Sequence, residues 1–99
     1  MVSTDVQVNI QRARQSLLQA QAATSQARLE LDDARNDQTR KRTLFSQDAI
    51  PKTQVEQAEL RFRIAEKVYA SALSQERSAA QGVRLSQANT GRNTVNQAE

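Results

Sequence analysis

Few residues of this chain could carry out chemistry, because it contains no histidine and no cysteine. The one compact group of carboxylates, Asp32, Asp33 and Asp37, offers the oxygen ligands that a hard cation prefers. The same spacing is typical of a solvated acidic face on a helix, which is the interpretation we favour. Gly82 and Gly91 stand alone, so no glycine-rich phosphate loop is present. We therefore expect no catalytic site, metal site or cofactor, and predict that the protein is not an enzyme.

Arginine recurs at one position of a seven-residue repeat in each half of the chain. These residues are Arg14, Arg28, Arg35 and Arg42, and then Arg63, Arg77 and Arg84. One interpretation is solvated charge that pairs with acids of the helices. The candidate acids are Glu30, Asp32, Glu66 and Glu76. The other interpretation is lateral contact with neighbouring copies of the chain.

Nucleic-acid binding is a third alternative for the basic residues. The formal net charge is only +3, and the chain has three aromatic residues on which bases could stack. From Arg35 to Lys52, however, cations exceed acids, so the positive charge is concentrated near the middle of the chain. We expect no nucleic-acid partner.

The composition indicates which elements must position these groups. Only 37% of the 99 residues are hydrophobic, many of these are alanine, and glycine and proline together number three. A chain with so few large apolar side chains cannot fill a globular core of normal size. Alanine, glutamine, leucine, arginine and glutamate favour helix. The sequence therefore predicts long, thin helices that are largely exposed to water.

Apolar residues alternate at spacings of three and four, which indicates helices that wrap around each other. In the first half this seam comprises Val6, Ile10, Ala13, Leu17, Ala20, Thr24, Ala27, Leu31, Ala34, Gln38, Lys41 and Phe45. In the second half it comprises Val55, Ala58, Phe62, Ala65, Tyr69, Ala72, Glu76, Ala79, Val83 and Ser86. The pattern predicts one helix at about residues 4–46, a turn at about 47–52 and a second helix at about 53–92.

The seam contains two series of alanines that are spaced by seven residues. If the chain folds back about residues 49–50, Ala34 meets Ala65, and Leu31 meets Tyr69 in the next layer. The residues expected to pack across the hairpin are Ala20, Ala27, Leu31, Ala34, Ala65, Tyr69, Ala72 and Ala79. Small residues at these positions allow the helix axes to approach closely. The predicted fold is all-α, a long antiparallel two-helix coiled-coil hairpin.

Two further features surround the predicted turn. Pro51, the only proline, suits the first position of the second helix, and Thr53 with Glu56 fits a capping box. Leu60, Ile64 and Val68 form a second apolar stripe outside the seam. This stripe either broadens the buried face or contacts a third helix or a neighbouring subunit.

The turn sequence resembles that of the periplasmic adaptor proteins, or membrane fusion proteins, of bacterial tripartite efflux and secretion systems. The tip motif of that family is Arg, three residues, Leu, six residues, Ser. Arg40 and Leu44 match it, and Pro51 stands where the family usually has serine. The segment AIPKTQVEQA, residues 49–58, also resembles the family's turn and the helix that follows it.

The resemblance implies a helical hairpin whose tip docks onto a TolC-type outer-membrane channel. The docking residues it implies are Arg40, Leu44, Phe45, Ile50 and Pro51. It also implies a segment cut from a larger adaptor. That adaptor would be located in the periplasm or cell envelope and anchored to the inner membrane. The other domains of that adaptor, absent from this segment, would contact an inner-membrane transporter of ABC type, and neighbouring adaptor copies would complete a ring. The alternatives are a generic coiled-coil scaffold or oligomerisation module and a nucleic-acid-binding hairpin.

Overall fold

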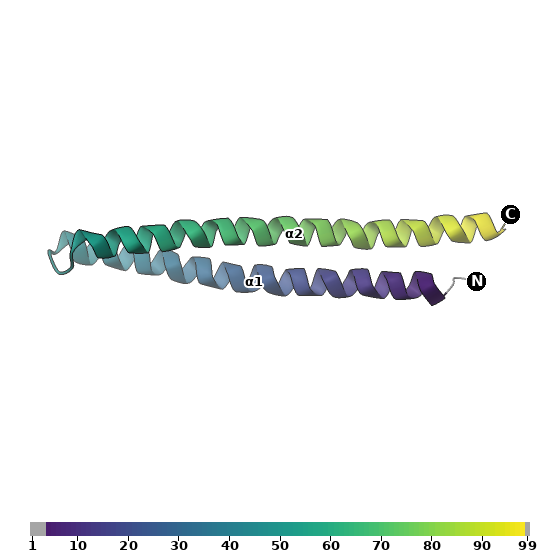
Figure 1. Ribbon diagram of the computed structural model, residues 1–99, viewed down its shortest axis with the longest axis horizontal. Coiled ribbons are helices and arrows are strands. Elements are labelled where there is room, and N and C mark those ends of the chain that lie inside the picture. The colour runs from purple at the N-terminus through teal and green to yellow at the C-terminus, as the bar shows by residue number, and fades with distance from the viewer. Residues whose placement is uncertain (1–3, 99) are drawn as a thin grey trace. The chain divides into compact units, whose positions relative to one another are not determined.

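The chain forms two helices that are joined by a short turn. The computed structural model describes the backbone of residues 4–98 and the side chains of residues 4–88. Helix α1 spans Thr4–Ser46, and helix α2 spans Lys52–Ala98 (Figure 1). The predicted all-α two-helix hairpin is confirmed, and the described residues contain no strand. Helix α2 reaches Ala98, whereas the sequence pattern predicts an end near residue 92.

The helices follow from the local sequence. Helix α1 contains 43 residues without a glycine or a proline, so nothing in it breaks the backbone hydrogen-bond ladder. Asp5 lies in its first turn, where a negative charge is favourable beside the unpaired N–H groups. Helix α2 contains Gly82 in its interior, and alanine at such a position would favour the helix more.

The chain divides into two compact units. The first, here called the turn unit, is Ala23–Ala72, and the second, here called the terminal unit, is Met1–Ala22 with Leu73–Glu99. Each unit contains part of α1 and part of α2, because the chain reverses direction at the turn between Ser46 and Lys52. The two units are described separately below.

The turn unit contains every residue that is buried among those described. These residues are Ala27, Leu31, Ala34, Val55, Ala58 and Ala72, and all of them are positions of the predicted seam. Ala34 is only 1% exposed. Most of the core consists of methyl side chains, which let two helix backbones lie close together and leave little volume to fill.

One polar seam residue of the turn unit forms a hydrogen bond across the helices. The Thr24 hydroxyl donates to the backbone carbonyl oxygen of Ala72, with Oγ1 and O separated by 3.2 Å. A half-buried hydroxyl would be costly without a partner, and this bond satisfies it. Threonine can therefore occupy a seam position that otherwise favours an apolar residue.

The terminal unit has a more accessible seam. Its described seam residues are all half-buried and none is fully buried. They are Val6, Ile10, Ala13, Leu17 and Ala20 of α1, and Glu76, Ala79, Val83 and Ser86 of α2. The same three-four spacing therefore buries less of each side chain in this unit than in the turn unit.

Candidate docking site at the turn

The candidate docking site is the turn between α1 and α2, and its backbone is held by a specific cap. The N–H of Ala49 donates to the carbonyl of Leu44 at 2.9 Å, and the N–H of Asp48 donates to the carbonyl of Phe45 at 3.0 Å. Asp48 has a φ of 57°, in the left-handed region. Two such bonds around a left-handed residue define a Schellman motif, which satisfies carbonyls that a helix end would otherwise leave unpaired.

Sequence reasoning missed the role of Asp48. Glycine is the usual residue at this position, since a side chain disfavours the left-handed conformation. Aspartate is among the residues that tolerate it best, although at some cost in free energy. A signal was available, because Pro51 follows Asp48 closely and proline is common just after this kind of cap.

The start of α2 differs from the prediction by one residue. The N–H of Gln54 donates to the carbonyl of Pro51 at 3.1 Å, and the helix begins at Lys52. Pro51 therefore precedes the first helical residue, and Thr53 lies inside the first turn. The predicted capping box is wrong, because a capping threonine must stand just before the helix. Pro51 has no N–H of its own to satisfy, and its fixed φ suits the entry into a helix.

The predicted docking residues differ in exposure. Leu44 and Ile50 are half-buried, whereas Arg40 and Pro51 are exposed. Phe45 is 41% exposed, so its assignment to the buried seam is wrong. Leu44 is the more buried of the two neighbours, and its carbonyl accepts the 2.9 Å bond from Ala49. The turn thus combines two partly covered aliphatic side chains with an accessible phenyl ring and a cation.

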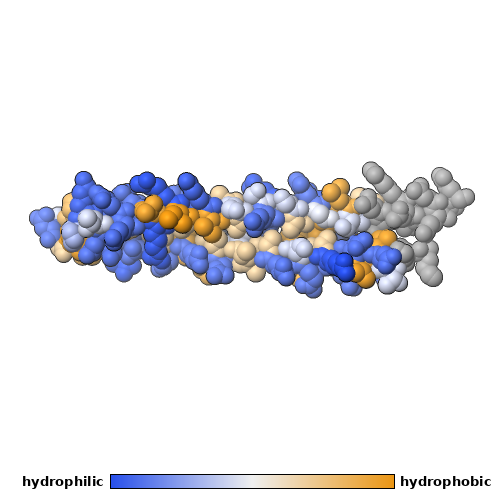
Figure 2. All heavy atoms as spheres, viewed as in Figure 1, coloured by the Kyte–Doolittle hydropathy of each residue, from blue (hydrophilic) through white to orange (hydrophobic). Residues whose placement is uncertain are grey.

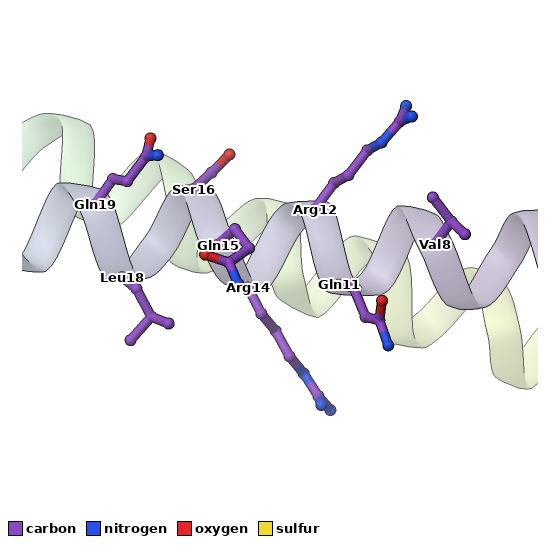
Figure 3. A pocket seen from close by; sticks show the side chains of 8 residues that line it. All are labelled: Val8, Gln11, Arg12, Arg14, Gln15, Ser16, Leu18 and Gln19. Atoms are coloured by element: carbon purple, nitrogen blue, oxygen red, sulfur yellow. The ribbon is translucent and has the colours of Figure 1, made fainter.

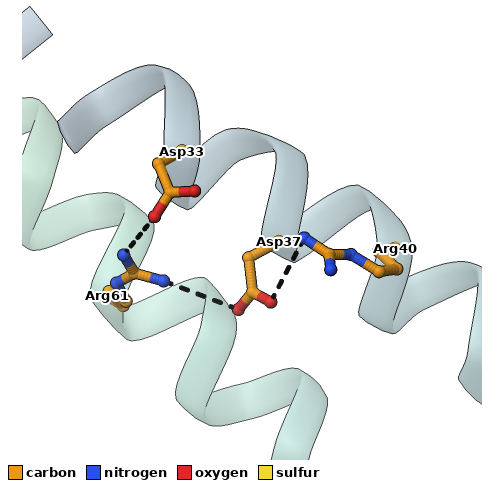
Figure 4. A network of polar contacts seen from close by, with 4 residues as sticks. All are labelled: Asp33, Asp37, Arg40 and Arg61. Carbon is orange, nitrogen blue, oxygen red and sulfur yellow. Dashed lines mark hydrogen bonds and ion pairs between the residues drawn. The ribbon is translucent and has the colours of Figure 1, made fainter. Parts of the chain in front are cut away.

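A network of ion pairs joins the helices on one side of the turn unit (Figure 4). An Arg61 Nη2 to Asp33 Oδ2 contact of 2.7 Å and an Arg61 Nη1 to Asp37 Oδ2 contact of 3.8 Å link α2 to α1. Arg40 Nη2 lies 3.9 Å from Asp37 Oδ1, one turn along α1. The side chain of Arg40 is 64% exposed, so its guanidinium remains accessible.

A second set of contacts joins the helices on the other side. Arg42 donates from Nη2 and Nε to Glu59 Oε1, at 3.1 and 3.3 Å. The guanidinium carbon of Arg35 lies 5.7 Å from the centre of the Phe62 ring, within the range of a cation–π contact. Arg42 therefore pairs with an acid, as one interpretation of the flanking arginines predicts, but Glu59 is not among the acids named from the sequence. Exposed pairs of this type contribute about 0.2–1 kcal/mol each.

Two of the three carboxylates in the acidic cluster form ion pairs with arginine. Asp33 and Asp37 both contact Arg61, and Asp32 is exposed. Among the residues that the structure describes, no group of three or more potential ligands could hold a metal ion. Within the same part of the chain, neither helix has a stretch long and apolar enough to cross a membrane.

The terminal unit contains a hollow on the surface of α1, between Val8 and Gln19 (Figure 3). Its long side chains do not converge on a common point. Arg12 and Arg14 point to different sides of the helix, and Leu18 is 58% exposed. A small-molecule site requires polar groups that converge on the ligand, and the side chains of this hollow do not converge. The turn is therefore the better candidate for a functional site.

Comparison with known proteins adds no relative. No family model, no curated protein and no solved structure matches the chain.

Proposed function

We propose that this hairpin is the docking element of a periplasmic adaptor in a tripartite export system. Its turn would bind the periplasmic end of a TolC-type outer-membrane channel. The proposal is supported by the turn motif, Arg40 with Leu44, and by the position of both residues on the last turns of α1. An ABC-type transporter of the inner membrane is the proposed partner of the domains that would flank this hairpin, and the periplasm is the proposed location.

The observation that carries the proposal is the accessible apolar and basic chemistry on a well-held turn. Leu44 and Ile50 are only half-buried, and Phe45 is 41% exposed. Apolar side chains that stay exposed on a capped turn are suited to insertion between helices of a partner. The cap matters because a pre-ordered turn loses little conformational entropy when it binds.

Arg40 supplies the polar part of the proposed contact. Its only described ion pair, at 3.9 Å to Asp37, is long and solvent-exposed. Such a pair is weak, so it costs little to exchange it for a new partner. The planar guanidinium could then donate to backbone carbonyls or to a carboxylate of the channel.

The direct test is binding of the purified chain to the channel protein of the same organism, measured by surface plasmon resonance. Leu44→Asp should reduce the affinity by at least about tenfold, because a charge would enter an apolar groove. Leu29→Asp is the matched control, since Leu29 is 71% exposed on the same helix and distant in sequence from the turn. Circular dichroism should show unchanged helicity for both variants. Full binding by Leu44→Asp would refute the docking role of the turn.

Two further variants test the separate contributions of Arg40 and Pro51 to the proposed contact with the channel. Arg40→Ala should weaken binding less than Leu44→Asp does, by the value of a charge-assisted hydrogen bond. Pro51→Ser should bind the channel as the unchanged chain does. Pro51 acts through the backbone, and the substitution restores the serine that is usual in the family. Loss of binding in Pro51→Ser would mean that the proline itself touches the channel.

A further inference from the structure

The apolar stripe outside the seam is exposed and borders a polar groove between the helices. Leu60, Ile64 and Val68 of α2 are 56%, 54% and 46% accessible, and Figure 2 shows apolar surface over this part of the helix. The stripe therefore does not broaden the buried face of the turn unit. Gln57, one helical turn before Leu60, lines the groove, so the two surfaces are neighbours on α2.

The groove lies between α1 and α2 near the turn and has a volume of about 400 Å³. It is lined by Asp37 and Lys41 of α1 and by Gln54, Gln57, Ala58 and Arg61 of α2. Lys41 and Ala58 are both positions of the predicted seam, and Ala58 is only 4% exposed. An alanine fills little of the layer between two helices, which leaves room for a groove beside the lysine.

Lys41 is a half-buried cation without an opposite charge. It forms no ion pair or hydrogen bond with any residue that the structure describes. Asp37, one turn earlier on α1, is already engaged, because Oδ2 contacts Arg61 and Oδ1 contacts Arg40 (Figure 4). A charge that is partly removed from water is costly when no counter-charge replaces the water. An anion from outside the chain would offset this cost.

The charges around the groove select the kind of anion. Three cations, Lys41, Arg40 and Arg61, lie there with two carboxylates, Asp33 and Asp37. One positive charge is therefore left without a counter-charge. A carboxylate group carries a single negative charge and balances it, whereas a doubly charged phosphate would leave an excess of negative charge.

Two glutamine amides supply neutral donors to the same groove. Gln54 is half-buried and Gln57 is exposed, and neither side chain forms a hydrogen bond with a described residue. Each amide has two N–H donors, and a carboxylate accepts through two oxygens. One oxygen can therefore accept from the Lys41 ammonium while the other accepts from an amide.

We propose that this groove binds one carboxylate side chain, of an aspartate or a glutamate, on the protein that docks at the turn. The inference rests on the proposed function, because it gives the channel a second point of contact. Lys41 and Leu44 are three residues apart and share one face of α1, so a helix that packs on Leu44 can reach the groove. The groove opens on one side of the hairpin only, and a charge-assisted contact there would fix the orientation of the docked partner.

The first experiment tests the groove without the channel. Sodium acetate supplies a free carboxylate, and sodium chloride at equal ionic strength is the control. In NMR spectra of the isotope-labelled chain, millimolar acetate should shift the side-chain amide signals of Gln54 and Gln57 more than chloride does. Lys41→Met should abolish this difference, whereas Lys67→Met, at an exposed lysine of α2 further from the turn, should retain it. If acetate and chloride shift these signals alike in the unchanged chain, the proposal is wrong.

The second experiment measures binding to the channel protein by surface plasmon resonance. Lys41→Met should reduce the affinity by about two- to tenfold, as expected for a partly exposed charge-assisted contact. Methionine keeps the apolar stem in the seam, so circular dichroism should show unchanged helicity. The loss of affinity should shrink at about 0.5 M salt, which screens the charge. A loss that salt leaves unchanged would assign Lys41 a packing role and overturn the proposal.

The control variants separate failure of this inference from failure of the proposed function. If Leu44→Asp weakens binding while Lys41→Met binds fully, the turn docks but no carboxylate enters the groove. If neither change affects binding, the turn is not the docking site. Lys67→Met should leave the affinity unchanged. Equal losses in Lys41→Met and Lys67→Met would indicate a general attraction between charges and would also overturn the proposed carboxylate site.

Discussion

The turn unit and the terminal unit share one sequence pattern but differ in packing. All the buried residues among those described lie in the turn unit, where Ala34 is 1% exposed and Ala27 and Ala58 are each 4% exposed. In the terminal unit the described seam residues are only half-buried. The ion pairs that Arg42 and Arg61 form between α1 and α2 also lie within the turn unit. Three-four spacing alone therefore does not determine how closely two helices pack.

The difference follows from the residue types at the seam. The turn unit places alanine layers beside Leu31 and Val55, so methyl groups and branched side chains fill the space between the helices. The terminal unit places Glu76 and Ser86 at seam positions of α2. Polar seam residues alone do not produce the difference, because Gln38 and Lys41 occupy seam positions of the turn unit as well. Glu76 differs in placing a carboxylate in the seam of the terminal unit, and a charge is costly to bury. We expect the turn unit to dominate the stability of the chain.

The sharpest test of this comparison removes one leucine from each unit. Leu31→Ala should reduce the free energy of unfolding by about 2–4 kcal/mol, because it deletes a side chain that is 7% exposed. Leu17→Ala, in the half-buried seam of the terminal unit, should cost about half as much. Urea titration followed by circular dichroism gives both values. Equal losses would show that the two units contribute alike.

Overpacking provides a second test of the same difference. Ala34→Leu should cost about 1–3 kcal/mol, since a 1% exposed methyl group leaves no room for a larger side chain. Ala20→Leu introduces the same change at a half-buried position of the terminal unit and should be close to neutral or slightly stabilising. Thermal unfolding of the two variants compares them directly. A larger loss for Ala20→Leu would mean that the terminal unit is the tighter one.

The fold was largely predictable from the sequence because it depends on simple periodic features. Repeated alanines and the absence of glycine and proline from residues 4–46 determine long helices, and the single interruption at residues 47–51 locates the reversal. The difference in burial between the two units was harder to predict from the sequence. It depends on which side chains meet in each layer of the seam and how well they fill it, and spacing carries no information on that.

The details of the turn were the least predictable part of the candidate site. The sequence located Leu44 and Pro51 near the reversal, but not the left-handed Asp48, because aspartate is a far weaker signal for that conformation than glycine. It also assigned Phe45 to the seam instead of Leu44. The choice between two neighbouring apolar residues at a helix end depends on where the last hydrogen bonds form, which periodicity cannot resolve.

A stabilising substitution in the terminal unit should narrow the difference in stability between the two units. Gly82 lies inside α2 in the terminal unit, and a methyl group added there would meet no atom within 4 Å. Gly82→Ala should raise the free energy of unfolding by about 0.5–1 kcal/mol, because alanine loses less conformational freedom in a helix. Circular dichroism at increasing temperature measures the gain. A destabilised variant would show that the glycine is required for a contact of its own.

The smallest expected effect concerns the ion pairs that join the helices of the turn unit. Arg61→Gln removes both contacts to Asp33 and Asp37 and should cost less than about 1 kcal/mol, since the Arg61 side chain is 54% exposed. The cost should shrink further at high salt, which screens exposed charges. Arg77→Gln, in the terminal unit, is the matched control and should be near neutral at any salt concentration. If Arg61→Gln instead cost as much as Leu31→Ala, the turn unit would owe its stability to charge rather than to its alanine layers.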